Sequence, residues 1–261
     1  MNISKNYIYI LTISLIAFFV YYYFDLHNQI KNLNKVTYVN CSLINKIKND
    51  HYENLIESPN DAVFKYITLP LDYTYGSNSI PLTVASLISK GDLLELGMGL
   101  FSTPLLHNIA AHNNRKIVSV DTSYDWLKRF LIYNLTKTHE IYHVSESNLY
   151  EFGLNKKWGL VLVDHAKGGE RYRNVISFSK LAEIVVLHDA EKMSENGYKY
   201  EHNKVRSYFL YACKFSVYPN AQKDFYTSTL ILSNFIKLDF LDGIFNRIKT
   251  DYGHVGCNLN Y

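Results

Sequence analysis

The chain has 261 residues, with 27 basic and 24 acidic side chains and a net charge of +3 at pH 7. This length accommodates one α/β domain with additional segments. The small positive excess gives no basis for nucleic-acid binding. The cysteines Cys41, Cys213 and Cys257 are far apart and lack C-x-x-C or Cys/His spacing, so they do not predict a zinc site. One disulfide would form if the domain faced an oxidising compartment.

The N-terminal part contains an uncharged apolar run at residues 7–24, with tyrosines at both ends. As a helix this run is about 27 Å long, close to the thickness of a bilayer core. No small-residue cleavage site follows, so we expect a single-pass anchor that is not removed. The predicted organisation is a tail (1–6), a transmembrane anchor (7–24), a polar stalk or linker (25–57) and an α/β domain (58–261).

The side of the membrane is left open, because few charged residues flank the run and the positive-inside rule therefore favours neither orientation. On a lumenal side, Asn40 and Asn134 would be glycosylation acceptors, since each begins an Asn-x-Ser/Thr triplet.

The segment 58–261 alternates short apolar runs with helical segments, which predicts a parallel sheet covered on both faces. Residues 69–81 form either a plain connector or a segment that folds over the site. Helices are expected at 82–89, 104–111, 124–135, 172–181 and 234–250. Parallel strands are expected at 93–96, 117–120, 141–144, 160–163 and 184–187, and an antiparallel pair at 209–218 and 226–232.

The first predicted strand runs into a glycine turn and then a helix, in the sequence Asp92-Leu-Leu-Glu-Leu-Gly-Met-Gly-Leu-Phe-Ser-Thr103. Glycine accepts positive φ and lets a ligand approach the backbone. The helix that follows offers free N–H groups to an anionic group. We therefore expect a nucleotide-like cofactor at Gly97 and Gly99. The dinucleotide fingerprint G-x-G-x-x-G does not fit, because Ser102 stands at its third glycine.

The second predicted strand ends in Asp121, a carboxylate about 20 residues beyond the glycine turn, where an acid can bind a ribose diol. Glu95, Gly97 and Gly99 form an E-x-G-x-G turn. Such a turn, followed by an acid at the end of the next strand, resembles the cofactor site of S-adenosylmethionine (SAM) methyltransferases.

Polar clusters also follow the later strands. Asp164-His165-Ala-Lys167 comes after the fourth, and His188-Asp189-Ala-Glu191 comes after the fifth. The carboxyl ends of parallel strands lie at one edge of a sheet, which is where open α/β sheets bind ligands. We therefore expect these groups to converge with the glycine turn and Asp121.

Residues 92–191 resemble the core of class I SAM-dependent methyltransferases. The resemblance implies a Rossmann-like, doubly wound, mostly parallel seven-stranded sheet. The acceptor side is more weakly similar to two subfamilies. Catechol-type O-methyltransferases carry D-H-x-K and an acidic pair that bind a divalent metal and supply a lysine base. Membrane-anchored glucuronoxylan O-methyltransferases carry V-D-x-P-x-G and V-H-D. The chain departs from the first at Ala190, where Asn is expected, and from the second at Ala166-Lys167, where Pro is expected.

The resemblance also implies roles for individual residues. A divalent ion, Mg²⁺ or Mn²⁺, would bind Asp164 and Asp189 and lower the pKa of an acceptor hydroxyl. The run from Glu170 to Arg173 fits either an acidic acceptor or an i,i+3 pair on an exposed helix. The implied SAM-binding residues are Glu95, Gly97, Gly99, Ser102 and Asp121, with Glu146 and Asn148 on the adenine side. The implied catalytic residues are Asp164, His165, Lys167 and His188.

Together these patterns predict a membrane-anchored SAM-dependent methyltransferase that modifies an oxygen of a sugar or other small hydroxyl compound. Its partner would be a small-molecule or glycan acceptor. Two alternatives are an NAD-linked oxidoreductase and a degenerate methyltransferase fold that serves as a membrane-bound interaction module. The intact set of Glu95, Gly97, Gly99 and Asp121 argues against decay of the site.

Overall fold

The computed structural model describes residues 52–72, 74–191, 197–217, 227–250 and 255–259. The predicted tail, the anchor at 7–24, most of the stalk and Cys41 lie outside the described residues. Within the described ranges, no helix combines the length and the apolar character needed to cross a membrane.

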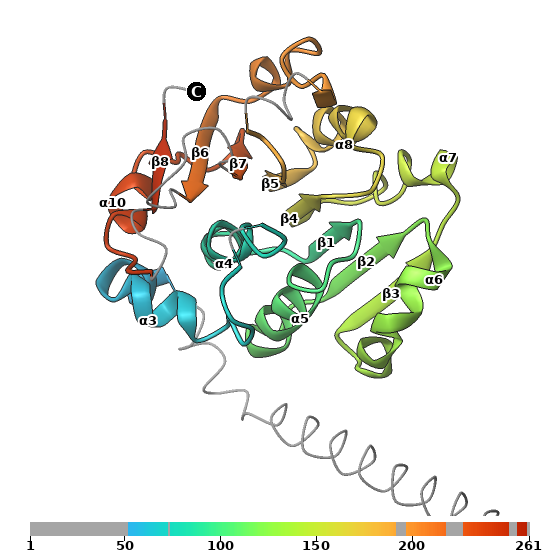
Figure 1. Ribbon diagram of the computed structural model, residues 1–261, viewed down its shortest axis with the longest axis horizontal. Coiled ribbons are helices and arrows are strands. Elements are labelled where there is room, and N and C mark those ends of the chain that lie inside the picture. The colour runs from blue at the N-terminus through green and yellow to red at the C-terminus, as the bar shows by residue number, and fades with distance from the viewer. Residues whose placement is uncertain (1–51, 73, 192–196, 218–226, 251–254, 260–261) are drawn as a thin grey trace, which may run out of the picture. The chain divides into compact units, whose positions relative to one another are not determined.

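In the described part of the chain, eight strands form one sheet in the order β3–β2–β1–β4–β5–β7–β6–β8 (Figure 1). Strands β1 to β5 pair in parallel, whereas β5–β7, β7–β6 and β6–β8 are antiparallel pairs. The strands are β1 (Leu93–Leu96), β2 (Ile117–Asp121), β3 (His139–His143), β4 (Trp158–Val163), β5 (Ala182–Leu187), β6 (Tyr211–Val217), β7 (Ser228–Ser233) and β8 (Val255–Asn258). The mostly parallel α/β architecture and the late antiparallel pair are confirmed, and β8 extends the seven strands that were expected.

Helices cover both faces of the sheet. The helical elements are α3 (Pro59–Phe64), α4 (Ser79–Ile88), α5 (Ser102–His112), α6 (Tyr124–Leu127), η1 (Lys128–Leu135), α7 (Glu146–Leu149), η2 (Gly168–Glu170), α8 (Arg171–Phe178), η3 (Val205–Tyr208) and α10 (Leu241–Phe245), where η denotes a 3₁₀ helix. The expected helix at 124–135 is therefore two elements, a short α-helix followed by a 3₁₀ helix.

The strand β1 shows how the sheet is buried on both sides. Leu93 packs with α4 and α5, whereas Leu94 and Leu96 pack with α8 on the opposite face. Alternate residues of a strand point to opposite faces, so a strand covered on both faces must be apolar throughout. Glu95 is the exception in this strand, and it lies on the α5 side.

The prediction of a helix over 234–250 was wrong. The Ser233 hydroxyl accepts hydrogen bonds from the backbone N–H groups of Phe235 and Ile236, at 3.0 and 2.8 Å. Such local side-chain bonds compete with helix formation. The chain forms α10 only at Leu241–Phe245 and later returns to the sheet as β8.

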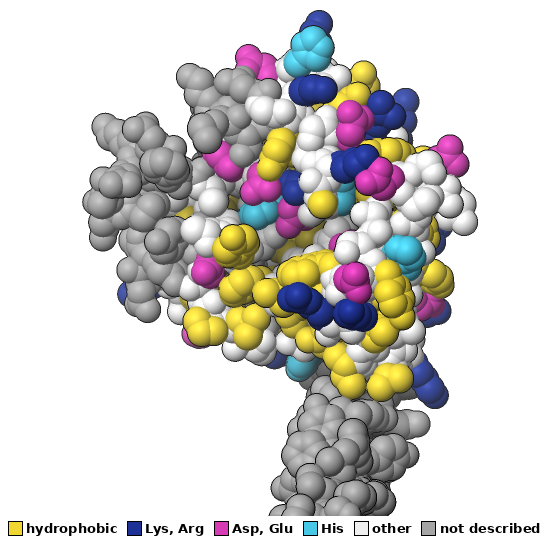
Figure 2. All heavy atoms as spheres, turned by 45° about the vertical axis from the view of Figure 1, so that its right-hand side comes forward, with side chains coloured by type: hydrophobic (Ala, Val, Ile, Leu, Met, Phe, Trp, Pro, Cys, Tyr) yellow, Lys and Arg dark blue, Asp and Glu magenta, His cyan; other side chains and the backbone are white. Residues whose placement is uncertain are grey.

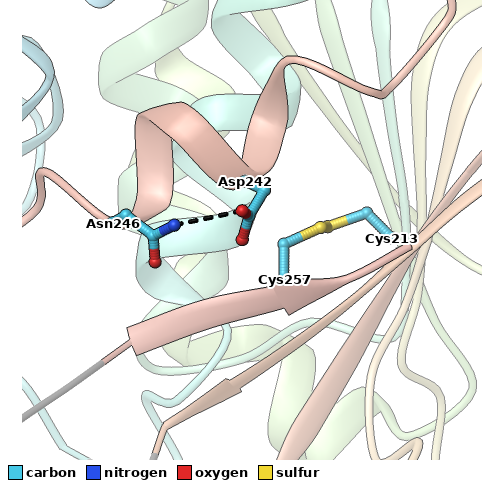
Figure 3. Close-up of a disulfide and its surroundings, with 4 residues drawn as sticks. All are labelled: Cys213, Asp242, Asn246 and Cys257. Atoms are coloured by element: carbon cyan, nitrogen blue, oxygen red, sulfur yellow. Dashed lines mark hydrogen bonds between the residues drawn. A yellow bond between two sulfur atoms is a disulfide. The ribbon is translucent and has the colours of Figure 1, made fainter. Parts of the chain in front are cut away.

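Two features tie the ends of the described unit to its core. Leu55 is fully buried and belongs to the same core as Val63, so packing begins before residue 58, inside the segment expected to be a stalk. A disulfide joins Cys213 of β6 to Cys257 of β8 beside α10, where the Asn246 amide donates to Asp242 (Figure 3). The pairing of these two cysteines among three was not predicted.

Candidate active site

Gly97 lies at the end of β1, where the chain turns with φ of +94°. A Cβ atom at this position would lie 2.4 Å from the His165 Cα atom and 2.5 Å from the carbonyl group of Asp164. Glycine is therefore required, because the end of β4 lies directly against the turn. The atoms that lie closest to a side chain at position 97 are thus backbone atoms of Asp164 and His165, and the sequence motif did not reveal this contact.

Glu95 lies behind the turn, fully buried. Its carboxylate accepts hydrogen bonds from the Ser102 hydroxyl at 2.7 Å, from Thr103 at 3.0 Å and from Ser119 at 2.5 Å. Burial raises the pKa of Glu95 to about 7, although these three hydroxyls oppose the shift. Glu95 and Ser102, both expected to bind the cofactor, thus bind each other inside the protein, and their hydrogen bond connects β1 to the start of α5 behind the glycine turn. Gly99 has a related constraint, since a Cβ there would meet the Ser102 hydroxyl at 2.7 Å.

Asp121 and the glycine turn lie side by side. The backbone N–H of Met98 donates to Asp121 Oδ2 at 3.0 Å, and the N–H of Ser123 donates to Oδ1 at 2.8 Å. Trp126 fixes the turn from the other side, because its indole N–H donates to the Met98 carbonyl at 2.6 Å. Each carboxylate oxygen of Asp121 retains lone-pair capacity for a further donor.

The helix α5 starts immediately after this turn. Its N-cap residue, Phe101, makes no capping hydrogen bond with its side chain. The first turn of a helix carries N–H groups without intrahelical partners and a partial positive charge. The end of the helix next to Gly99 therefore suits an anionic group.

Glu146 and Lys167 form an exposed ion pair that connects the segments following β3 and β4. The hydrogen bond that Lys167 donates to Glu146 raises the pKa of Lys167 above its ordinary value, so Lys167 stays protonated near neutral pH. This opposes the expected role of Lys167 as a general base. Asn148 lies two residues after Glu146 in α7 and is exposed.

Three ionisable residues that follow β4 and β5 do converge as expected. Ligand atoms of Asp164, His188 and Asp189 all lie within 4.8 Å of one another. His188 Nδ1 is 3.3 Å from Asp164 Oδ1 and 3.4 Å from Asp189 Oδ1. Asp189 has a left-handed backbone with φ of +56°, a conformation that non-glycine residues adopt mainly where their surroundings impose it.

The guanidinium of Arg171 lies between the two carboxylates. Nη2 is 3.0 Å from Asp164 Oδ1, Nη1 is 2.8 Å from Asp189 Oδ2, and Nε donates to the His165 carbonyl at 2.8 Å. Arg171 is 5% exposed. This guanidinium holds one oxygen of each carboxylate, so a divalent ion bound to Asp164 Oδ1 and Asp189 Oδ2 would compete with it, although Asp164, His188 and Asp189 are close enough together to form a metal site.

His188 also contacts the segment that precedes the sheet. Its Nε2 lies 3.0 Å from the hydroxyl of Ser77, which is buried. Burial alone would lower the pKa of His188, but the Asp164 and Asp189 carboxylates outweigh it and raise this pKa above its ordinary value. The segment 69–81 therefore does reach the site, and Ser77 is a site residue that the sequence did not indicate.

His165 differs from His188. It is buried, its Nε2 pairs with the Asn174 amide oxygen at 3.2 Å, and burial lowers its pKa to about 4. The ring is neutral and packs against Tyr150 beneath α8, so the expected catalytic role has no geometric support.

The run from Glu170 to Arg173 takes the form of the helical alternative. Arg173 pairs with Glu170 at 2.7 Å on the exposed side of α8, while Arg171 points inward. The signal was available in the sequence: Arg171 shares a helix face with Asn174, Val175 and Phe178, all of them buried.

Figure 2 brings forward the side of the molecule toward which β1 and β2 run. Acidic and histidine side chains lie there among basic ones, with hydrophobic side chains below them. Exposed hydrophobic residues near the glycine turn include Leu100, which follows Gly99, and Tyr124 at the start of α6, which are 52% and 57% exposed. A bound molecule at this edge would thus meet both charged and apolar surface.

The sequence matches no family model and no curated protein. Solved structures with a similar fold include the spermidine synthase of Thermotoga maritima, with 11% identity over 69% of this chain and 68% of that chain and a TM-score of 0.48. They also include an O-methyltransferase from Bacillus cereus in complex with SAH (10% identity, 77% and 94% coverage, TM-score 0.48). A third is the O-methyltransferase TomG of Streptomyces achromogenes in complex with SAM (15% identity, 69% and 89% coverage, TM-score 0.46).

Proposed function

We propose that this chain is a SAM-dependent methyltransferase that acts on the oxygen of a sugar or other small hydroxyl compound. The observation that carries the proposal is the contact of Met98 N–H with Asp121 Oδ2 at 3.0 Å. It joins the glycine turn to the acid of the next strand at the carboxyl edge of the sheet, where open α/β folds bind nucleotides.

The residues present suit SAM. Asp121 would accept hydrogen bonds from the ribose diol, and the N-terminus of α5 would bind the carboxylate of the methionine end. Gly97 and Gly99 let the turn that would hold the cofactor pack closely against the end of β4 and against Ser102. When bound, the cofactor supplies a sulfonium with an electrophilic methyl group. The protein's own contribution is to position the acceptor and to take its proton.

His188 is the proposed general base. Asp164 and Asp189 face Nδ1, which fixes the tautomer that leaves Nε2 unprotonated, and Nε2 faces the Ser77 hydroxyl. For a proton from the acceptor hydroxyl to pass through Ser77 to Nε2, the Ser77 hydroxyl would turn from the Thr74 carbonyl, to which it donates at 2.9 Å, and give its own proton to Nε2 while it takes the acceptor's. The Asp164 and Asp189 carboxylates, which raise the pKa of His188, would stabilise the imidazolium that forms when the ring accepts the proton.

The predicted anchor at 7–24 would hold the enzyme at a membrane as a single-pass protein. The disulfide between Cys213 and Cys257 favours an oxidising side of that membrane, since such bonds persist there. Asn134 is exposed and would then be a glycosylation acceptor. A mobility shift on endoglycosidase treatment that Asn134→Gln reduces and Asn40→Gln/Asn134→Gln abolishes would support this orientation. Labelling of both cysteines in freshly lysed cells would oppose it.

Calorimetric titration of the full chain with SAM and, separately, with NAD tests the cofactor. We expect SAM binding, at least a tenfold loss of affinity with Asp121→Ala, and no binding of NAD. Tighter binding of NAD than of SAM would favour the oxidoreductase alternative.

Transfer of labelled methyl groups to a panel of glycans and small hydroxyl compounds tests the reaction. Ser77→Ala and His188→Asn should lower kcat while SAM affinity stays within about twofold, because neither residue contacts the cofactor turn. SAM binding without transfer to any acceptor would favour the degenerate, non-catalytic alternative.

A further inference from the structure

Arg171 occupies the place between Asp164 and Asp189 where the resemblance to catechol-type enzymes would put a metal ion. Its two terminal nitrogens each face one carboxylate, at 3.0 and 2.8 Å. Metal–oxygen distances for Mg²⁺ or Ca²⁺ run from about 2.0 to 2.6 Å. A cation at such distances from both Asp164 Oδ1 and Asp189 Oδ2, the oxygens that Arg171 contacts, would overlap the guanidinium. The two positive charges would also repel each other strongly at this range.

Arg171 is also built into the fold. Its Nε donates to the His165 carbonyl, its guanidinium lies 5.2 Å from the centre of the Tyr198 ring, and its side chain is 6% exposed. A buried arginine needs counter-charges, and Asp164 and Asp189 provide them. The planar fork of arginine can hold two carboxylates in fixed directions, which a lysine cannot do.

We propose that Arg171 is the resident cation of this site, taking the place of a divalent metal, and that it is a positioning residue for His188. The inference deepens the proposed function and rests on it for the role of His188. Arg171 fixes the orientation of the Asp164 and Asp189 carboxylates through Asp164 Oδ1 and Asp189 Oδ2. Both carboxylates in turn face His188 Nδ1.

Binding of Mn²⁺ to the full chain tests this directly, through the loss of the free-ion signal in electron paramagnetic resonance. The wild type should bind no Mn²⁺ in the low millimolar range. Arg171→Met should gain one site with at least 100-fold higher affinity, and Arg171→Met/Asp164→Asn should lose it again. Arg171→Lys keeps the positive charge and should bind none.

Stoichiometric Mn²⁺ binding by the wild type that Asp164→Asn abolishes would overturn the proposal. A folded Arg171→Met protein, checked by circular dichroism, that gains no Mn²⁺ site would also overturn it. If Arg171→Met does not fold, the wild-type titration and Arg171→Lys still decide the question. SAM titration of the same wild-type sample separates the two hypotheses, because failure to bind SAM refutes the proposed function and leaves the Mn²⁺ result standing.

Discussion

Replacing Gly97 with alanine should destabilise the domain and disturb the cofactor turn together. Two costs add. A non-glycine residue at φ of +94° carries backbone strain of about 1–3 kcal/mol. The new methyl group would also lie 2.4–2.5 Å from backbone atoms of Asp164 and His165, which cannot rotate away, and overpacking of this kind costs about 1–3 kcal/mol or more.

The sum is about 4 kcal/mol, a large part of the 5–15 kcal/mol that stabilises a typical domain. For a domain of this size each kcal/mol lowers Tm by roughly 2–4 °C, so Gly97→Ala should melt about 8–16 °C below the wild type. The strain is relieved when the ends of β1 and β4 move apart. SAM affinity should therefore fall as well, by at least tenfold.

Differential scanning calorimetry of the full chain measures the first effect, and titration with SAM below the lower Tm measures the second. Gly243→Ala is the matched control, since a Cβ at this helical position meets nothing within 4 Å. It should melt at or slightly above the wild-type temperature, because alanine favours helix. Equal melting temperatures for the two variants would refute the argument that β4 requires glycine at position 97.

Three further predictions concern other parts of the site and the fold. The folded pKa of Glu95, about 7, lies above the ordinary value of 4.5 for this side chain, so the free energy of unfolding should fall as pH rises from about 5 to about 7, by at most 1.4 kcal/mol per unit. Glu95→Gln should flatten this slope in urea titrations. Lys167→Met should leave kcat within about twofold, because its exposed pair with Glu146 keeps the amine protonated. Cys213→Ser removes a bridge closing 44 residues and should lower the free energy of unfolding by about 4 kcal/mol.

Each of these predictions has a control in the same chain. Glu201→Gln changes an exposed carboxylate and should leave the pH slope intact. Lys128→Met breaks a similar exposed pair, with Asp125, and the kcat of this variant shows how much the loss of such a pair alone changes methyl transfer. Dithiothreitol should lower the Tm of the wild type but not that of Cys213→Ser. A steeply pH-dependent Glu95→Gln protein, an inactive Lys167→Met enzyme or an unchanged Cys213→Ser melting curve would contradict the respective argument.

Much of the sheet was predictable because its parallel strands are buried on both faces. A strand of that kind must be a continuous apolar run, and Leu160–Val163 and Ile184–Leu187 are such runs. The convergence of Asp164 with His188 and Asp189 followed from the same fact, since parallel strands end at one edge. The C-terminal region gave no comparable signal, and there the Ser233 hydroxyl turns the chain away from a helix.

The partners within the site were harder to predict. Glu95 and Ser102 were expected to face a ligand, but a buried carboxylate needs donors, and the hydroxyls of Ser102 and Ser119 supply them. The contact of Ser77 with His188 joins residues 111 apart in sequence, so no local pattern announces it. Arg171 was the missed residue with a readable signal, because an i, i+4, i+7 spacing places it on the buried face of α8 with Val175 and Phe178.

The two halves of the site share one structural element, the end of β4. Gly97 admits the backbone of Asp164 and His165 against the cofactor turn. The same two residues hold Arg171, one through its carboxylate and the other through its carbonyl. A displacement of the glycine turn therefore moves the groups that orient His188, and loss of Arg171 frees the backbone on which the turn rests. Gly97 and Arg171 thus both depend on the end of β4, and in the proposed mechanism this element would set the distance between the methyl donor and the base.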